Sequence, residues 1–270
     1  MALFLTTAGL VLVFILPMIV WFFKRPSNHR DWSPDQAILS YADIAGQSVK
    51  IHNIRNFQYR SEHDYNTEYY DKDFDLNKIK SLEYVIDPFS KKIGAAHTFL
   101  TFGFENDGHV AISIEIRKKK GDSFSPWRGL FRSFEIMYVI ADERDVIKLR
   151  TNFRKDEVYL FPVKASPQEI RALFLDILKR VNQLKEKPEF YNTVLNSCAV
   201  NVVAHVNRVT KRKIPWSFKI FFPAYSDRFI YDLGLIDTHL SFEEARKKYY
   251  VSKRGQNCGD DEDFSKKIRT

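Results

Sequence analysis

The chain has 270 residues, 44% hydrophobic and 28% charged, which is enough for one sizeable folded core and excludes a disordered or low-complexity protein. Its two cysteines exclude a disulfide scaffold. The net charge of +8 fits an anionic lipid or a nucleic acid partner without identifying either.

The first 23 residues carry no charged side chain and predict a transmembrane anchor over residues 1–25. The apolar run from Leu3 to Phe23 would span roughly 31 Å as a helix, about the thickness of a hydrocarbon core. Lys24 and Arg25 follow this run. A cleaved signal peptide has its cations before the apolar region, whereas here they follow it, so the segment does not have the layout of a signal peptide. The positive-inside rule would place these cations, and the domain after them, in the cytoplasm.

Residues 26–48 contain Pro26, Pro34 and Gly46 and predict an extended linker. The single domain that follows, residues 49–251, begins with apolar residues alternating with polar ones, a pattern that predicts strands. Asn106-Asp107-Gly108 predicts a hairpin turn. Loops are expected at 58–80 and 118–128, and strands at 49–57, 82–86, 97–104, 110–117, 134–141 and 157–163.

Ser166, Pro167 and Glu169 form the signature of a helix start with a capping box. The apolar stripe after them predicts a helix to about Lys185. Two more helices are expected, one from about Asn196 and one over 241–250, and residues 252–270 predict a polar, mobile tail. The expected fold class is α+β, with a mainly antiparallel sheet packed with helices and preceded by one transmembrane helix.

Cys198 lies near the expected start of the second helix. The free backbone N–H groups and the positive end of the helix dipole at such a position favour a thiolate, the reactive form of the side chain. Cys198 is therefore a candidate nucleophile, and a buried structural cysteine is the alternative. Cys258, in the polar tail, is expected to be an idle exposed thiol.

A thiol nucleophile needs a base within hydrogen-bond reach, and His97 is the best-placed histidine. It lies on the polar face of the expected hairpin with Thr101, and the partner strand adds Ser113, Glu115 and Arg117 to this face. Glu115 would orient His97 and complete a Cys-His-carboxylate set. An ordinary solvent-facing side of an antiparallel sheet fits the same pattern.

Five segments of the domain resemble a known family: Val49 to Glu62, Ala96 to Phe102, Ala111 to Lys118, Phe134 to Asp145 and Tyr191 to Asn201. They resemble the bacterial membrane-protein family described as the Lnb N-terminal periplasmic domain, which takes its name from a lipoprotein N-acyltransferase. The resemblance covers about residues 45–250 in order. Members usually read Asn-Cys-Thr-Thr at the cysteine, whereas this chain has Asn196-Ser197-Cys198-Ala199-Val200. A histidine followed later by a helix-opening cysteine is also similar to circularly permuted papain-like enzymes of the NlpC/P60 type.

The resemblance implies a membrane-anchored, cysteine-dependent acyltransferase that acts on lipid-linked substrates through a thioester, with lipoprotein N-termini as the expected acceptors. It implies a single-pass protein of the bacterial inner membrane whose domain faces the periplasm or exterior. This orientation is opposite to the cytoplasmic one that the positive-inside rule predicts from Lys24 and Arg25. It makes Cys198 and His97 catalytic, with Glu115 as third member and Ser113 and Glu143 as its competitors. Substrate contacts are expected from Asn196, Ser197, Ser113, Arg117 and Tyr138.

Two other functions remain open at the level of the sequence. A papain-like thiol also suits a cell-envelope peptidase or amidase, in which water takes the acyl group. A non-catalytic, membrane-tethered binding module would use the basic residues Arg117 to Lys120, Arg128 and Arg132 to meet anionic lipid. The aromatic-rich segment 216–231 fits either an acyl-binding wall or ordinary core. No nucleic-acid-binding motif and no metal-ligand spacing is present, so we expect neither partner and no cofactor.

Overall fold

The computed structural model describes residues 19, 22–89, 94–106, 108–259 and 261–270. The transmembrane anchor predicted for residues 1–25 therefore falls mainly outside the described residues. Of the helices that are described, none has both the length and the hydropathy needed to cross a membrane.

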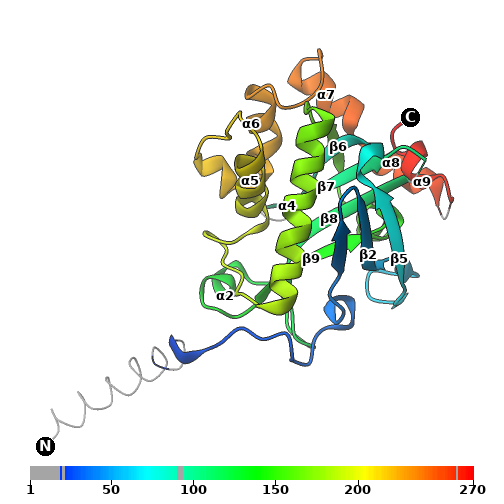
Figure 1. Ribbon diagram of the computed structural model, residues 1–270. Coiled ribbons are helices and arrows are strands. Elements are labelled where there is room, and N and C mark those ends of the chain that lie inside the picture. Colours follow the sequence, from blue (N-terminus) through cyan, green and yellow to red (C-terminus); the bar gives the residue numbers. More distant parts are fainter. Residues whose placement is uncertain (1–18, 20–21, 90–93, 107, 260) are drawn as a thin grey trace, which may run out of the picture.

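The strands form a mixed, mainly antiparallel sheet in the order β1, β2, β9, β8, β7, β6, β10, with β5 also paired to β2 (Figure 1). The β2–β9 pair is parallel and joins at Arg55 and Ala141. A separate short hairpin is formed by β3 and β4. The strands are β1 (Tyr41–Ala45), β2 (Ser48–Arg55), β3 (Gln58–Tyr59), β4 (Tyr65–Asn66), β5 (Tyr69–Asp75), β6 (Ile79–Pro88), β7 (Ala96–Phe104), β8 (Gly108–Arg117), β9 (Glu135–Ala141) and β10 (Tyr159–Pro162).

Helices cover both faces of this sheet, and the long α4 crosses one face beside α5 (Figure 1). The other face is covered by α3, α8 and α9. The helices are α2 (Pro126–Leu130), α3 (Glu143–Lys148), α4 (Pro167–Glu186), α5 (Cys198–Val209), α6 (Ser226–Asp232), α7 (Phe242–Tyr249), α8 (Ser252–Cys258) and α9 (Phe264–Lys267). Single turns occur at η1 (Pro34–Gln36), η2 (Leu76–Lys78), η4 (Phe218–Ile220) and η5 (Pro223–Tyr225), and a π-helical turn, η3 (Leu149–Arg154), follows α3.

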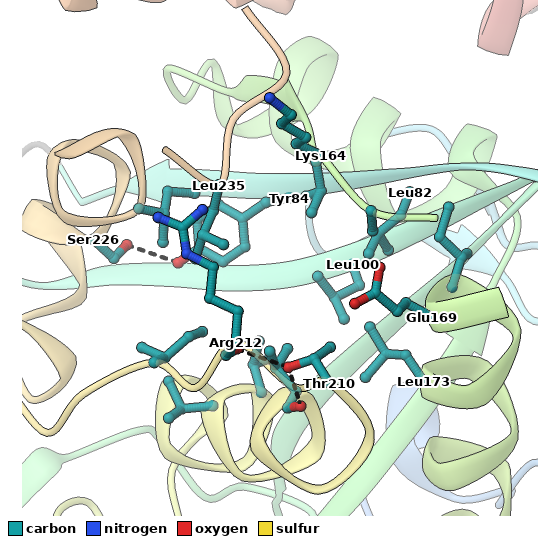
Figure 2. Close-up of a pocket in the computed structure, with 18 of the residues that line it drawn as sticks. Leu82, Tyr84, Leu100, Lys164, Glu169, Leu173, Thr210, Arg212, Ser226 and Leu235 are labelled. Carbon is teal, nitrogen blue, oxygen red and sulfur yellow. Dashed lines mark hydrogen bonds between the residues drawn. The ribbon is translucent and has the colours of Figure 1, made fainter. Parts of the chain in front are cut away.

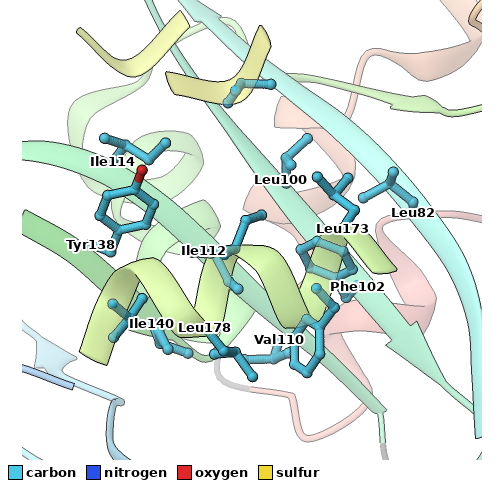
Figure 3. Packing of buried hydrophobic residues seen from close by; sticks show 14 of the residues in the cluster. Leu82, Leu100, Phe102, Val110, Ile112, Ile114, Tyr138, Ile140, Leu173 and Leu178 are labelled. Atoms are coloured by element: carbon cyan, nitrogen blue, oxygen red, sulfur yellow. The ribbon is translucent and has the colours of Figure 1, made fainter. Parts of the chain in front are cut away.

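The larger hydrophobic core lies between the sheet and α4 (Figure 3). Because successive residues of a strand point to opposite faces, Leu100 and Phe102 of β7 and Ile112 of β8 all point toward Leu173 and Leu178 of α4. Burying each such side chain contributes roughly 1.5–3 kcal/mol. The capping box predicted at Ser166 and Glu169 is formed and fixes where α4 begins.

The smaller core lies on the opposite face and includes the end of the chain. Residues 252–270, expected to be a mobile polar tail, instead form α8 and α9, with Phe264 and Ile268 0% exposed. Arg269 follows them and makes ion pairs with Glu83 and Glu143. The acidic residues before α9 led to the prediction of a polar tail. Phe264 and Ile268 are four residues apart, which is the spacing of neighbours on one side of a helix.

The α+β class and most expected elements are confirmed. The predicted hairpin corresponds to β7 and β8, and Asn106 and Gly108 adopt the positive φ angles of 65° and 76° that its turn requires. Two segments are more regular than expected. The linker 26–48 contains β1, and the loop 58–80 contains β5, which pairs with β2 although its apolar residues are few.

Candidate functional site

The β7–β8 hairpin opens at the end away from its turn. The two strands pair from Phe104 and Gly108 down to Phe99 and Ser113. Beyond this point the first residues of β7 pair only with β6, whereas the last residues of β8 pair only with β9. The two neighbouring strands thus separate, and the sheet has a gap at this end.

A cavity of about 240 Å³ lies at this gap and is lined from both faces of the sheet. Ala96, Ile114 and Cys198 line it on the side of α5, and His97 and Glu115 line it on the side of α3. The remaining described lining residues include Arg55, Tyr59, Glu62, Tyr65, Phe89, Leu149, Arg150, Arg154 and Tyr191. The sequence-predicted nucleophile and base therefore line one cavity, although they come from opposite faces of the sheet.

His97 belongs to a hydrogen-bonded chain along the polar face of the hairpin. Its Nε2 lies 2.6 Å from Ser113 Oγ, and the Ser113 hydroxyl lies 2.9 Å from Glu115 Oε1. The direct distance from His97 Nε2 to Glu115 Oε1 is 3.8 Å. Of the predicted third member, Glu115, and its competitor on β8, Ser113, it is Ser113 that contacts the imidazole directly, and Glu115 is connected to His97 through Ser113. If the serine hydroxyl donates to the carboxylate, His97 Nε2–H donates to the serine and Nδ1 carries no proton.

Arg150 of η3 supplies the positive charge of this cluster. Its Nη2 lies 3.7 Å from Glu115 Oε1, and its Nε lies 3.1 Å from Oδ2 of Asp87, which pairs with His97 across β6 and β7. Burial, with the Arg150 charge, lowers the pKa of His97 to about 3. Burial opposes ionisation of Glu115 as well, but the nearby cationic side chains lower its pKa to about 2. At neutral pH the cluster therefore contains a neutral imidazole beside an ionised glutamate.

Cys198 is the first residue of α5, and Ser197 is the N-cap. Burial raises the pKa of the Cys198 thiol, and the nearby polar groups of Thr98 and Ala199 offset only part of this effect. The direction is opposite to the one expected from the helix dipole, because desolvation outweighs it at this position. Among the described residues no hydrogen bond joins the thiol to His97, although both side chains line the same cavity.

The remaining predicted substrate-binding residues have internal partners. Asn196 donates to the Phe190 carbonyl and accepts from Asn201, which fixes the loop before α5. Arg117 is buried, donates to the carbonyls of Gln36 and Ala37 and stacks on a tryptophan. This removes Arg117 from the predicted basic surface, where Arg128 is likewise paired with Asp122.

Tyr138 belongs to a buried network that holds α5 against its neighbours. Its hydroxyl lies 2.8 Å from His205 Nε2, and His205 Nδ1 lies 2.6 Å from Asp176 of α4. Tyr138 lies outside the lining of the cavity described above. Glu143, a competitor for the third catalytic position, accepts from Thr101 and pairs with Arg269 at the far end of the polar face.

The sequence did not identify Arg150 or Asp87 as site residues. Asp87 is 0% exposed, and its carboxylate forms an ion pair with Arg150. Asp145, also missed, is bound by Arg55, by the Phe57 backbone and by Tyr59, and it thereby holds one wall of the cavity on α3. The sequence signal for Asp87 was an aspartate before a proline at the end of a predicted strand, whereas Arg150 lies in a π-helical turn that no sequence pattern indicated.

Within the described ranges, no group of three or more His, Cys, Asp or Glu side chains is arranged to hold a metal ion. No curated protein and no solved structure is significantly similar to the chain. Residues 65–224 match the protein family described as the Lnb N-terminal periplasmic domain, and the match includes β7, β8 and α5. It covers more than half of the chain, and the family description places the domain on the periplasmic side. The chain therefore belongs to the Lnb N-terminal periplasmic domain family.

Proposed function

We propose that the protein is a membrane-anchored thiol acyltransferase that uses Cys198 to take an acyl group from a lipid ester and pass it to an amine. The observation that carries this proposal is the shared cavity, in which a helix-opening cysteine lies across the sheet gap from an oriented histidine. Lipid-linked substrates follow from the family and from the apolar N-terminal run, and lipoprotein N-termini are the amines that we expect.

In the first step the Cys198 and His97 side chains approach each other within the shared cavity, since they are not hydrogen-bonded in the resting structure. His97 Nδ1 then accepts the thiol proton while the sulfur attacks the ester carbonyl carbon. The alcohol leaves with the proton from His97, and a thioester remains on Cys198. In the second step the amine attacks the thioester and an amide forms. The amine proton passes through His97 to the departing sulfur, and the enzyme returns to its starting state.

The electrostatics favour a neutral resting pair over a thiolate–imidazolium ion pair. Burial raises the pKa of Cys198 and lowers that of His97. The proton therefore moves during the attack, as in general-base catalysis. Cys198 opens α5, where the first backbone N–H groups have no partner within the helix, and donors of this kind can stabilise the negative oxygen that develops on the substrate.

The same arrangement supports a permuted papain-like architecture. The histidine lies on β7, polar residues that orient it lie on the next strand, β8, and the cysteine opens a later helix. In such enzymes one acyl-enzyme serves both transfer and hydrolysis, and the acceptor decides between them. A peptidase or amidase is therefore the outcome to be distinguished by experiment.

The test is formation of the acyl-enzyme. The purified full chain is incubated with 4-nitrophenyl octanoate without an amine, and its intact mass is measured before and after hydroxylamine, which cleaves thioesters. We expect a hydroxylamine-sensitive octanoyl adduct on the wild type and on the matched control Cys258→Ala, and none on Cys198→Ala. His97→Asn should slow its formation at least 100-fold.

The acceptor is tested by adding a peptide with an N-terminal diacylglyceryl-cysteine. Transfer predicts an N-octanoyl peptide formed at the expense of the adduct. Octanoate release with no peptide product would assign the protein to the hydrolases. An adduct of equal yield on Cys198→Ala, or neither an adduct nor Cys198-dependent release of 4-nitrophenol with the wild type, would refute a thiol mechanism altogether.

A further inference from the structure

A second and more apolar cavity, of about 270 Å³, lies on the side of the sheet covered by α4 and α5 (Figure 2). Leu82, Leu100 and Leu173 form one wall, and α5 supplies another (Figure 2). Cavities lined mainly by apolar side chains are the usual binding sites for apolar ligands. We propose that this cavity binds a single fatty acyl chain of the lipid substrate, with the ester end directed toward Cys198.

The position of the cavity along α5 supports this occupant. It is lined by Ala199, Val202, Val203, Val206 and Thr210, which form one side of the helix. These residues extend over roughly 16 Å of helix axis, enough for an extended chain of the order of ten methylene groups. Ala199 directly follows Cys198, so the two cavities meet α5 at adjacent residues.

Four polar side chains of the lining, those of Tyr84, Ser226, Glu169 and Arg212, have hydrogen-bond partners in the protein, which leaves a surface suited to hydrocarbon. Tyr84 and Ser226 hydrogen-bond to each other at 2.7 Å (Figure 2). Glu169 caps α4, and the Arg212 guanidinium donates to the Leu233 carbonyl. Since these groups have partners, an apolar ligand would not leave them without hydrogen bonds.

The segment next to the cavity exposes aromatic side chains to solvent. Ile220 and Phe229 line the cavity, whereas Trp216 is 70% and Phe218 66% exposed. Phe221, Phe222 and Tyr225 of the same segment are also exposed, so the segment presents more apolar surface to solvent than is usual for a soluble protein. Such a surface beside an apolar cavity suits passage of a hydrocarbon chain from a bilayer, and the segment 216–231 thus contributes both lining and exposed residues.

The orientation of the acyl chain, with its ester end toward Cys198, rests on the proposed function. The binding of an acyl chain in the cavity does not depend on that function. The test uses the full chain in vesicles of phosphatidylethanolamine and phosphatidylglycerol that contain palmitate with a photoactivatable diazirine. Irradiation and peptide mapping should locate crosslinks in residues 199–210 and 220–235, and unlabelled palmitate, but not butyrate, should remove them. Crosslinks confined to residues 1–25 would overturn the proposal.

Val203→Trp fills the cavity and should reduce these crosslinks at least tenfold, and Val203→Phe should reduce them less. Val200→Trp is the matched control, because Val200 is on the same helix and lines neither of the two cavities described here. Unchanged crosslinking in both Val203 variants would refute the assignment. Cys198→Ala should bind palmitate like the wild type. Palmitate binding without any acyl adduct would refute the proposed function alone, and octanoyl adduct formation without palmitate binding would refute this inference alone.

Discussion

Asp87 offers the sharpest test of the electrostatics around His97. Burial raises the pKa of Asp87 to about 6, with Arg150 opposing, from an ordinary value of 3.8. At about 1.4 kcal/mol per pH unit, this shift means that folding favours the protonated over the ionised carboxyl of Asp87 by about 3 kcal/mol. Because the folded pKa lies above the unfolded one, this contribution is fully present below pH 3.8 and is lost as pH rises through 6.

Asp87→Asn replaces the carboxyl with a neutral group of the same shape. At acid pH it mimics the protonated wild-type side chain, and at pH 8 it removes a buried charge. The free energy of unfolding of the variant, relative to the wild type, should therefore increase between pH 4.5 and pH 8 by about 2 kcal/mol. Lower pH is avoided because Glu115 and Glu143, whose pKa values are held at about 2, lose their stabilising effect as pH falls below 4.5.

Urea unfolding of both proteins at the two pH values, followed by tryptophan fluorescence, measures the change. Comparing differences at each pH cancels the titration of all groups that the two proteins share. A relative stability that is the same at pH 4.5 and 8 would refute the reasoning, and so would a variant that becomes relatively less stable at pH 8. Either result would mean that Arg150 fully compensates the buried carboxylate.

Three further changes test other parts of the structure. Arg269→Met should lower the free energy of unfolding by about 3–5 kcal/mol, because it leaves Glu143 ionised and buried without its cation; urea unfolding measures this, and a loss below about 1 kcal/mol would contradict it. Ser166→Ala should cost about 1 kcal/mol by removing the cap of α4, with the exposed Lys164→Ala as the comparison. In a Cys258→Ser background, iodoacetamide alkylation of Cys198 should still accelerate above pH 9, since burial raises the pKa of this thiol; a plateau below pH 8 by mass spectrometry would exclude that direction.

The parts of the fold that local patterns determine were predictable. Alternation and a turn containing Gly108 gave both strands of the hairpin, and Ser166 with an apolar stripe gave α4, because caps and periodicity act within a few residues. The C-terminal helices were missed since their stability comes from distant contacts. Phe264 packs on the sheet and Arg269 pairs with Glu143, and neither contact has a local signal.

The candidate site was predictable in its residues and not in its geometry. The shared face of His97, Ser113 and Glu115 follows from the period of two in strands, and the structure joins all three. The gap between β7 and β8, which brings Cys198 to the same cavity, depends on pairing with β6 and β9. The raised thiol pKa depends on burial, which a helix-start argument does not include.

The network around His205 has a consequence for how the thiol is positioned. Apolar packing is non-directional and would let a helix rotate or slide on a sheet. His205 hydrogen-bonds through Nδ1 to Asp176 on one helix and through Nε2 to the Tyr138 hydroxyl on a strand, and these two bonds fix the rotation of α5 and its position along its own axis. His205 lies seven residues after Cys198, roughly 10.5 Å along the axis, so residues outside the lining of the cavity help to set the position of the sulfur. Substitutions confined to the residues that line the cavity would therefore miss the His205 network, which sets the position of the Cys198 sulfur.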